Sequence, residues 1–224
     1  DYVPQTIEST LRRNEVDGCI AVQADQSEVE TRFLCELAKT HPFIKGVVGW
    51  IDLCADNVEE RLQHFSAYNA IKGYRHIVQG EPNDFLLRKD FQQGVKALKP
   101  FNYTYDVLIY HYQLKPALEF VSLFPDQKMV IDHCGKPDIR HKEIDEWARL
   151  MRKTWSAGDF YPYLDVVFEA FGTGRLMFGS DWPVILVSGM YVQWKSLLEK
   201  YLENYEEEDR EKVFGGNAIR FYHL

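Results

Sequence analysis

The sequence is poor in cysteine, and its cysteines are not spaced as a metal-binding motif. The four are Cys19, Cys35, Cys54 and Cys134, with no CxxC pair among them. Two of them lie in apolar, strand-like stretches, where a thiol behaves as a small hydrophobic side chain. This spacing argues against a zinc ribbon and favours reduced, mostly buried thiols in a cytoplasmic protein over a disulfide framework.

The sequence also lacks long apolar runs and basic clusters. No run approaches the roughly 20 residues that a membrane-spanning helix needs, and no signal-peptide pattern opens it. The formal net charge is -8, without a local excess of Lys and Arg. These features argue against nucleic acids and membranes as partners.

Apolar and aromatic side chains, by contrast, are plentiful. Of the 224 residues, 46% are apolar and 14% are aromatic. This composition supplies a sizeable hydrophobic core and argues against disorder. We expect residues 1–224 to form a single domain.

Six short stretches rich in Val, Ile and aromatic residues predict strands. Between them come amphipathic helical patterns, one opened by a capping box of Ser27 and Glu30 and another with Pro116 in its first turn. Alternating strands and helices predict an α/β fold with a parallel sheet built from right-handed crossovers. The predicted strands are 18–24, 44–51, 71–78, 103–109, 128–135 and 175–182.

The spacing of these strands is regular except in two places. Successive strand starts lie 26, 27, 32 and 25 residues apart, but the last interval is 47 and holds only helical patterns, among them 144–152 and 161–172. A helical pattern also opens the chain at 3–16 with no strand before it. We therefore predict a (β/α)8 TIM-type barrel in which the first strand, before residue 1, and one strand near 152–153 are absent from the sequence. The alternative is an open, six-stranded, doubly wound sheet.

Nearly every predicted strand ends on a polar or ionisable side chain. In parallel α/β folds, functional groups gather at the carboxyl ends of the strands. A site assembled from several strands explains this concentration better than a purely structural scaffold does. The side chains in question are Gln23, Asp25, Trp50, Asp52, Arg75, His76, Asp106, Asp132, His133, Asp181 and Trp182.

Several of these residues also have a structural explanation. Asp25 and Asp52 are expected to cap the helices that follow them. Asp106 lies in mid-strand, where a buried hydrogen bond to a neighbouring strand explains it as well as catalysis does. Neighbouring strand residues face opposite sides of a sheet, so only one of Arg75 and His76 can point inward, and we expect Arg75.

The strongest candidate is Asp181, in the stretch RLMFGSDWPV. Gly179 permits a close backbone approach, Ser180 can form a local hydrogen bond, and Pro183 prevents a strand from continuing. We therefore expect a rigid turn to hold the Asp181 carboxylate at the rim of the sheet, with the indole of Trp182 beside it.

His133 stands in a similar position. Its strand stops there, because IDHCGKP runs straight into a Gly and a Pro. That place favours a functional role over that of a core histidine. Gln23 and Trp50 are also compatible with packing at the rim.

Several motifs, in a consistent order, resemble the amidohydrolase-2 branch of the amidohydrolase superfamily. They are AVQADQS, GVVGWIDL, GYRHIVQ, IDHCGKP, GSDWP and FGGNAIRFY. Within that branch the sequence is similar to sugar-lactone hydrolases of the L-fuconolactonase and L-rhamnonolactonase type. The resemblance implies a (β/α)8 barrel with a His-x-His pair on its first strand and a Lys/Ser/Gly-containing motif on a strand before the last. Neither motif is present in this sequence.

The resemblance implies a hydrolase of carbohydrate catabolism that opens a sugar-acid lactone resembling L-fuconolactone. Asp181 would act as general base on the attacking water and return the proton to the departing ring oxygen. His133 and Arg75 would polarise the ester carbonyl and stabilise the developing oxyanion. The side chains implied to bind substrate are His76, Trp182, Gln23, Trp50 and Asp106.

A metal centre is less well supported by the residues. His133 and Asp181 are the expected ligands if an ion binds, whereas a catalytic zinc site usually has three protein ligands. Lactones are activated esters, which Asp, His and Arg can hydrolyse without a metal. We therefore expect no required cofactor, or an optional divalent metal such as zinc.

Two other functions remain open. One is a metal-dependent amidohydrolase or decarboxylase of the same superfamily, which requires at least three histidines around Asp181. The other is a non-catalytic barrel that binds a sugar acid, whose affinity would not depend on Asp181. The expected partners are a small-molecule sugar lactone and, for a homodimer, a second copy of the chain.

Overall fold

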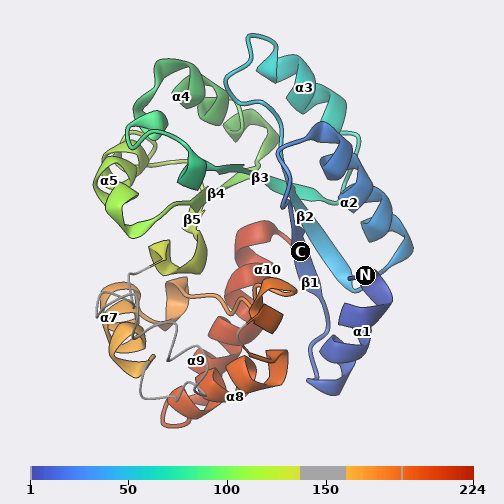
Figure 1. Cartoon of the computed structure of the whole chain (residues 1–224), viewed down its shortest axis with the longest axis vertical. Helices are drawn as coiled ribbons and strands as arrows, with labels where there is room; N and C mark the ends of the chain where they lie inside the picture. The colour runs from blue at the N-terminus through green and yellow to red at the C-terminus, as the bar shows by residue number, and fades with distance from the viewer. Residues whose placement is uncertain (1, 137–159, 188) are drawn as a thin grey trace. The chain divides into compact units, whose positions relative to one another are not determined.

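Five of the six predicted strands form one parallel sheet. The computed structural model describes residues 2–136, 160–187 and 189–224. The strands lie side by side in chain order, each parallel to the next. The predicted α/β fold with a parallel sheet is confirmed (Figure 1). The strands are β1 (Cys19–Val22), β2 (Ile44–Gly49), β3 (Ile71–Ile77), β4 (Thr104–Leu108) and β5 (Met129–Ile131).

The chain divides into two units. The sheet unit comprises Glu15–Lys136 and Phe221–Leu224, and the helical unit comprises Asp1–Asn14 and Pro137–Arg220. The helices of the sheet unit are α2 (Glu28–Thr40), α3 (Val58–Phe65), α4 (Lys89–Lys96) and α5 (Leu114–Ser122). The helices described in the helical unit are α1 (Pro4–Arg13), α7 (Tyr161–Phe171), α8 (Tyr191–Tyr201), α9 (Glu207–Glu211) and α10 (Asn217–Tyr222), and the last two residues of α10 belong to the sheet unit.

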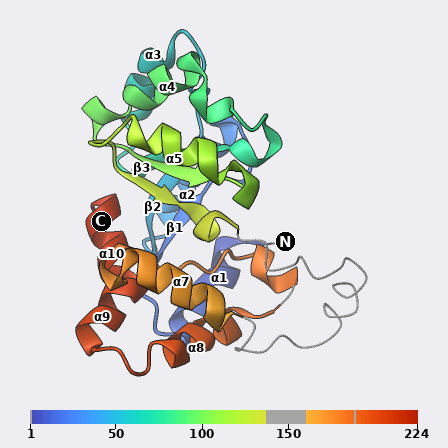
Figure 2. The same ribbon diagram turned by 90° about the vertical axis from the view of Figure 1, so that its left-hand side faces the viewer.

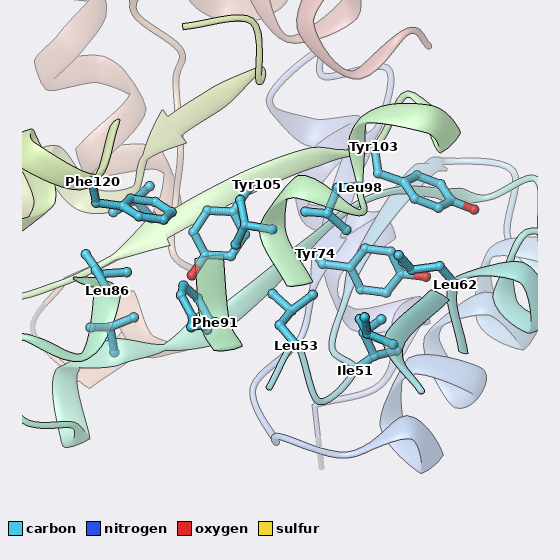
Figure 3. Close-up of a cluster of buried hydrophobic side chains, with 14 of the residues drawn as sticks. Ile51, Leu53, Leu62, Tyr74, Leu86, Phe91, Leu98, Tyr103, Tyr105 and Phe120 are labelled. Atoms are coloured by element: carbon cyan, nitrogen blue, oxygen red, sulfur yellow. The ribbon is translucent and has the colours of Figure 1, made fainter. Parts of the chain in front are cut away.

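The helices of the sheet unit lie along the outer side of the strands, and α3, α4 and α5 lie on the same side of the sheet in both views (Figures 1 and 2). The core between them is aromatic: Phe91 of α4 packs against Tyr105 of β4 and Phe120 of α5 (Figure 3). At Gly94, a Cβ atom would lie 1.9 Å from the carbonyl oxygen of Leu53. Only glycine therefore lets α4 approach the loop after β2 this closely.

The start of α2 forms largely as its sequence predicts. The Ser27 hydroxyl accepts a hydrogen bond from the backbone N–H of Glu30 at 3.1 Å. The Glu30 carboxylate does not return this bond to Ser27, as a capping box would require. Instead it accepts from the backbone N–H groups of Ala24 and Asp25, at 3.0 and 2.6 Å. Glu30 thereby fixes the loop that follows β1.

The predicted strand 175–182 is wrong. Thr173–Arg175 form a 3-10 turn, and residues 176–181 pair with no strand in the part of the chain that the structure describes. Here the backbone N–H of Phe178 donates to the carbonyl of Val213, at 2.8 Å. A strand needs a neighbour to pair its backbone groups. The barrel prediction placed its neighbours before residue 1 and near 152–153, outside the described residues.

All four cysteines are free, as expected. Burial raises the pKa of Cys19 to about 11 and that of Cys35 to about 12, so both stay protonated thiols at neutral pH. Cys134 is exposed, contrary to the expectation of mostly buried thiols. Within the described ranges, none of the helices combines the length and apolar character that crossing a bilayer requires.

Candidate active site

Arg75, on β3, is held at the carboxyl edge of the sheet by groups from both sides. Its Nη1 donates to Oδ2 of Asp132 at 2.8 Å, and its Nη2 donates to the carbonyl oxygen of Gln23. The Gln23 side chain returns a bond from Nε2 to the carbonyl of Arg75, at 3.0 Å. Gln23 follows β1 and Asp132 follows β5, each two strands from β3. Strands lie about 4.8 Å apart, so this edge must curve around Arg75 for both contacts to form.

Arg75 and His76 face opposite sides of the sheet, as expected for neighbouring strand residues. In the register, Arg75 pairs with Asp106 of β4, and Asp106 pairs with Val130 of β5. These three residues therefore share the face away from the helices. His76 lies on the helix side, where its ring stacks on Phe85 with centroids 4.7 Å apart. Arg75 is the inward residue of the two, as predicted.

The His76 ring is engaged by protein groups on both nitrogens. Nε1 of Trp50 approaches its Nδ1 at 3.4 Å, and its Nε2 lies 3.0 Å from a carboxylate oxygen of Glu81. Because the indole N–H can only donate, this arrangement assigns the ring proton to Nε2, which donates to Glu81. Only 8% of His76 is exposed. The sugar contacts predicted for His76 and Trp50 stay predictions.

Asp106 is buried in the inner face of the sheet and bonded to the end of the chain. The Tyr222 hydroxyl donates to its Oδ2 at 2.9 Å. The predicted buried hydrogen bond of Asp106 is therefore present, but its partner comes from α10 rather than from a neighbouring strand. Burial, and then the nearby charge of Asp132, raise the pKa of Asp106 well above its ordinary value. The Arg75 guanidinium therefore faces two carboxyl groups, and it is bonded to that of Asp132.

The raised pKa of Asp106 predicts a pH-dependent effect of Asp106→Asn on stability. The folded-state pKa of Asp106 lies above its unfolded value of about 3.9. The stability that its proton contributes is therefore present below about pH 4 and is lost as pH rises through the folded pKa. Asn has no such proton. Wild type therefore loses stability as pH rises and Asp106→Asn does not. The unfolding free energy of Asp106→Asn minus that of wild type, measured in urea titrations, should rise between pH 4.5 and pH 8.

A matched control is the exposed Asp126, whose pKa the Lys99 ammonium lowers. The charge of Asp126 stabilises the folded protein and is lost as pH falls. The unfolding free energy of Asp126→Asn relative to wild type should therefore fall slightly as pH rises, opposite to the change expected for Asp106→Asn. A relative stability of Asp106→Asn that stays level or falls with pH would contradict the raised pKa of Asp106 in the folded protein.

The end of β5 has an unusual backbone. His133, Cys134 and Lys136 have φ values of 51°, 52° and 46° in a 3-10 turn that directly follows the strand. The backbone N–H of Lys136 donates to the carbonyl of His133, at 2.9 Å. Consecutive non-glycine residues in the left-handed region cost free energy and occur preferentially at functional sites. The turn leaves His133 exposed at the carboxyl edge of the sheet, consistent with its expected functional role.

Asp181 lies in a tight turn of the helical unit. It is exposed and has a φ of 51°, and its carbonyl accepts from the backbone N–H of Ile185 at 3.0 Å. Asp tolerates this left-handed conformation better than most residues do. The Ser180 hydroxyl accepts from the N–H of Trp182 at 3.3 Å, which is the local bond expected there. At Gly179 no close approach is found, because a Cβ atom there would meet nothing within 4 Å.

The two predicted helix caps are wrong. Oδ1 of Asp52 accepts from the N–H of Cys54 at 2.9 Å, closing a local turn, while Asn57 precedes α3. Asp25 precedes Ser27, which caps α2, and Asp25 contributes its backbone N–H to Glu30. The Asp52 carboxylate thus orders the loop after β2, and Asp25 takes part in the loop after β1 through its backbone N–H.

The described side chains do not supply a catalytic zinc site. Among residues 2–136, 160–187 and 189–224, no three His, Cys, Asp or Glu side chains are placed to share an ion. His133 and Asp181, the two expected ligands, are fewer than the three that such a site usually has.

Three interactions at this edge were missed from the sequence. Opposite charges at two strand ends, on Arg75 and Asp132, were a signal for their ion pair. Glu81 lies five residues beyond its partner His76, in a loop without a motif. Tyr222 ends the motif FGGNAIRFY, but nothing in that motif marked it as the partner of Asp106, 116 positions away.

Comparisons with known proteins agree on one family. A sequence model of the family described as "Amidohydrolase" matches residues 2–224. The chain is 32% identical over 257 residues to an L-fucono-1,5-lactonase of Burkholderia multivorans, covering 100% of this chain and 86% of that protein. It is 27% identical over 249 residues to an L-fucono-1,5-lactonase of Burkholderia ambifaria, covering 100% of this chain and 86% of that protein.

A solved structure is also closely similar. The crystal structure of an amidohydrolase from Burkholderia multivorans with bound zinc superposes with a TM-score of 0.92 at 32% identity, covering 100% of this chain and 89% of that one. The alignment to the first lactonase is 257 positions long, whereas this chain has 224 residues. That relative therefore carries residues that have no counterpart here.

Proposed function

Because the chain belongs to the amidohydrolase family of hydrolytic enzymes, we propose that it hydrolyses the lactone of a sugar acid, with L-fuconolactone as the model substrate. The observation that carries the proposal is similarity to an L-fucono-1,5-lactonase along the whole chain. The chemistry of the carboxyl edge supports it. Ring opening turns a neutral ester into a carboxylate, and the fixed guanidinium of Arg75 suits such an anion.

The proposed catalytic roles are those that the family resemblance implies. Asp181 is the general base: it takes a proton from water as the water oxygen attacks the ester carbonyl. The ring C–O bond then breaks, and the protonated Asp181 returns the proton to the departing ring oxygen. Arg75 and His133 stabilise the negative charge on the carbonyl oxygen. The product hydroxy acid ionises and releases one proton to solution.

The substrate-binding roles are also proposals. Trp182 packs against the sugar ring, and its own ring meets that of Tyr2 edge-on, with centroids 5.5 Å apart. Gln23 is fully buried and holds Arg75, so it acts on the substrate through Arg75. Asp106 lies beside Arg75, on the neighbouring strand β4 and the same face of the sheet. His76, on β3 like Arg75, and Trp50, directly after β2, complete the set.

We further propose that the protein as a single domain follows the (β/α)8 barrel plan, with the first strand and one strand near 152–153 lacking from this sequence. The five parallel strands in chain order and the curved carboxyl edge support this plan. So does the longer alignment of the lactonase relative, which contains residues that this chain lacks. Among the described residues, β1 and β5 are the edge strands of this sheet, and the absent strands would pair there.

The proposal predicts hydrolysis that survives removal of metal. A panel of L-fucono-, L-rhamnono- and L-galactonolactones would be followed by proton release, before and after treatment with a strong chelator. We expect turnover of at least one lactone, with a rate that changes less than about twofold on chelation, because no described group of side chains forms a three-ligand site.

The other outcomes separate the alternatives. Activity that is lost on chelation and restored by zinc would contradict the metal-independent route and favour a metal-dependent amidohydrolase or decarboxylase. Binding of the sugar acid without turnover of any lactone would favour the non-catalytic barrel. The acidity of the product distinguishes these cases directly, because lactone hydrolysis releases a proton and binding alone does not.

A further inference from the structure

The end of the chain reaches into the centre of the sheet unit. Tyr222 is only 8% exposed, and its hydroxyl donates to Oδ2 of Asp106 at 2.9 Å. Nothing in the proposed reaction uses this contact. Because Asp106 pairs in register with Arg75, the Tyr222 hydroxyl lies on the face of the sheet that carries Arg75.

The segment that carries Tyr222 is fastened on both sides. The carbonyl of His223 accepts from Nζ of Lys72 on β3 at 3.4 Å, and the His223 ring contacts Nζ of Lys128, which directly precedes β5. The side chain of Leu224 lies 3.4 Å from the position of a Cβ at Gly46, on β2. Contacts to three strands hold the Tyr222 backbone in place, so its hydroxyl is a fixed donor.

The Asp106 carboxyl group can compete with Asp132 for the hydrogen bonds of the Arg75 guanidinium. One guanidinium lies near two carboxyl groups, and it is bonded to Asp132. Oδ1 of Asp106 and Nε of Arg75 are both buried with no hydrogen-bond partner among the described residues. If the Asp106 carboxyl group were free to turn, it would compete with Asp132 for Arg75. The Tyr222 hydroxyl prevents this turn by holding Oδ2.

We propose that Tyr222 is a positioning residue for Arg75, acting through the Asp106 carboxyl group. Tyr222 fixes the orientation of Asp106, and Arg75 then stays bonded to Asp132 and Gln23 with its guanidinium at the carboxyl edge. The role in catalysis rests on the proposed lactone hydrolysis, but the effect on Arg75 does not. Through the hydrogen bond from Tyr222 to Asp106, the position of the Arg75 guanidinium depends on residues 222–224.

The first test is Tyr222→Phe, which removes only the hydroxyl. We expect kcat for lactone hydrolysis to fall about 10-fold with KM nearly unchanged, because a misplaced donor loses part of the roughly 10²- to 10³-fold effect that one oxyanion donor provides. Tyr74→Phe is the matched control. Its hydroxyl is also buried, one residue from Arg75, and has no hydrogen-bond partner among the described residues. Its kcat should equal that of wild type.

The second test asks whether Tyr222 acts through Asp106. Asn at 106 cannot form an ion pair with Arg75, so Tyr222→Phe should lower kcat less than twofold in the Asp106→Asn background. This comparison remains available if Tyr222→Phe alone fails to fold, because the double variant has no buried carboxyl group without a partner. An equal 10-fold loss in both backgrounds would overturn the proposal.

The third test needs no activity. The Nε–H resonance of Arg75, assigned by its disappearance in Arg75→Lys, should shift and exchange faster with water in Tyr222→Phe and remain in place in Tyr74→Phe. An Arg75 resonance that is unchanged in Tyr222→Phe would overturn the positioning role. A shifted resonance in a protein that hydrolyses no lactone would sustain that role and refute the proposed function.

Discussion

Asp181→Asn is expected to lower kcat for lactone hydrolysis by about 10²- to 10⁴-fold, the range that a positioned general base contributes. The amide is nearly the same size as the carboxylate but cannot take a proton from water. Asn also tolerates the left-handed conformation that Asp181 adopts, with φ at 51°, so the turn should be retained. KM should change little, because the lost interaction belongs to the transition state. Proton release under saturating lactone measures the effect.

A matched control for this substitution is Asp165→Asn. Asp165 is also in the helical unit, where it accepts a hydrogen bond from the Tyr201 hydroxyl at 2.8 Å, and Asn can accept the same bond. Its kcat should equal that of wild type. If Asp181→Asn retained more than a tenth of the wild-type kcat while folding normally, Asp181 would not be the general base.

Arg75→Lys is expected to lower kcat/KM by about 10²- to 10³-fold, as the loss of an oxyanion donor does. Lysine keeps the positive charge, so the loss tests geometry rather than charge alone. Arg75 donates through separate nitrogens to Asp132 and to the carbonyl of Gln23. A single ammonium cannot hold both partners and present a planar donor group as well. Steady-state kinetics on the best lactone of the panel measures the change.

Arg61→Lys is the control for this second substitution. Arg61 of α3 makes two bonds to Glu28 of α2, at 2.8 and 2.6 Å, in the same unit. The Arg61→Lys variant loses a comparable two-bond contact at a site that takes no part in the proposed reaction. Its kcat/KM should therefore equal that of wild type. Activity of Arg75→Lys within threefold of wild type would remove Arg75 from the oxyanion site.

Much of the sheet unit could be predicted because its signals are local. Short apolar stretches flanked by helix starts such as Ser27 gave five strands, and the two-residue period of a strand placed Arg75 inward and His76 toward the helices. The position of His133 at a strand end also followed from the Gly and Pro that come after it. In each case, residues near one another in the sequence carry the information.

The rest depended on partners that are far away in the sequence. The stretch before Asp181 has the composition of a strand but, among the described residues, no strand beside it, and composition does not supply a neighbour. The bond between Tyr222 and Asp106 joins residues 116 positions apart, and the motif FGGNAIRFY, which ends on Tyr222, does not predict this pairing. Asp25 and Asp52 failed as helix caps because other residues, Ser27 and Asn57, stand closer to the helix starts.

The central claim is that the protein adds water to the carbonyl of a sugar lactone. The most direct test is hydrolysis of L-fuconolactone in water enriched in ¹⁸O, with the product acid analysed by mass spectrometry. The account predicts turnover well above the spontaneous rate and one ¹⁸O atom in the product carboxylate, because the water oxygen bonds to the carbonyl carbon. A rate equal to the spontaneous one, or label in the released hydroxyl instead, would contradict it.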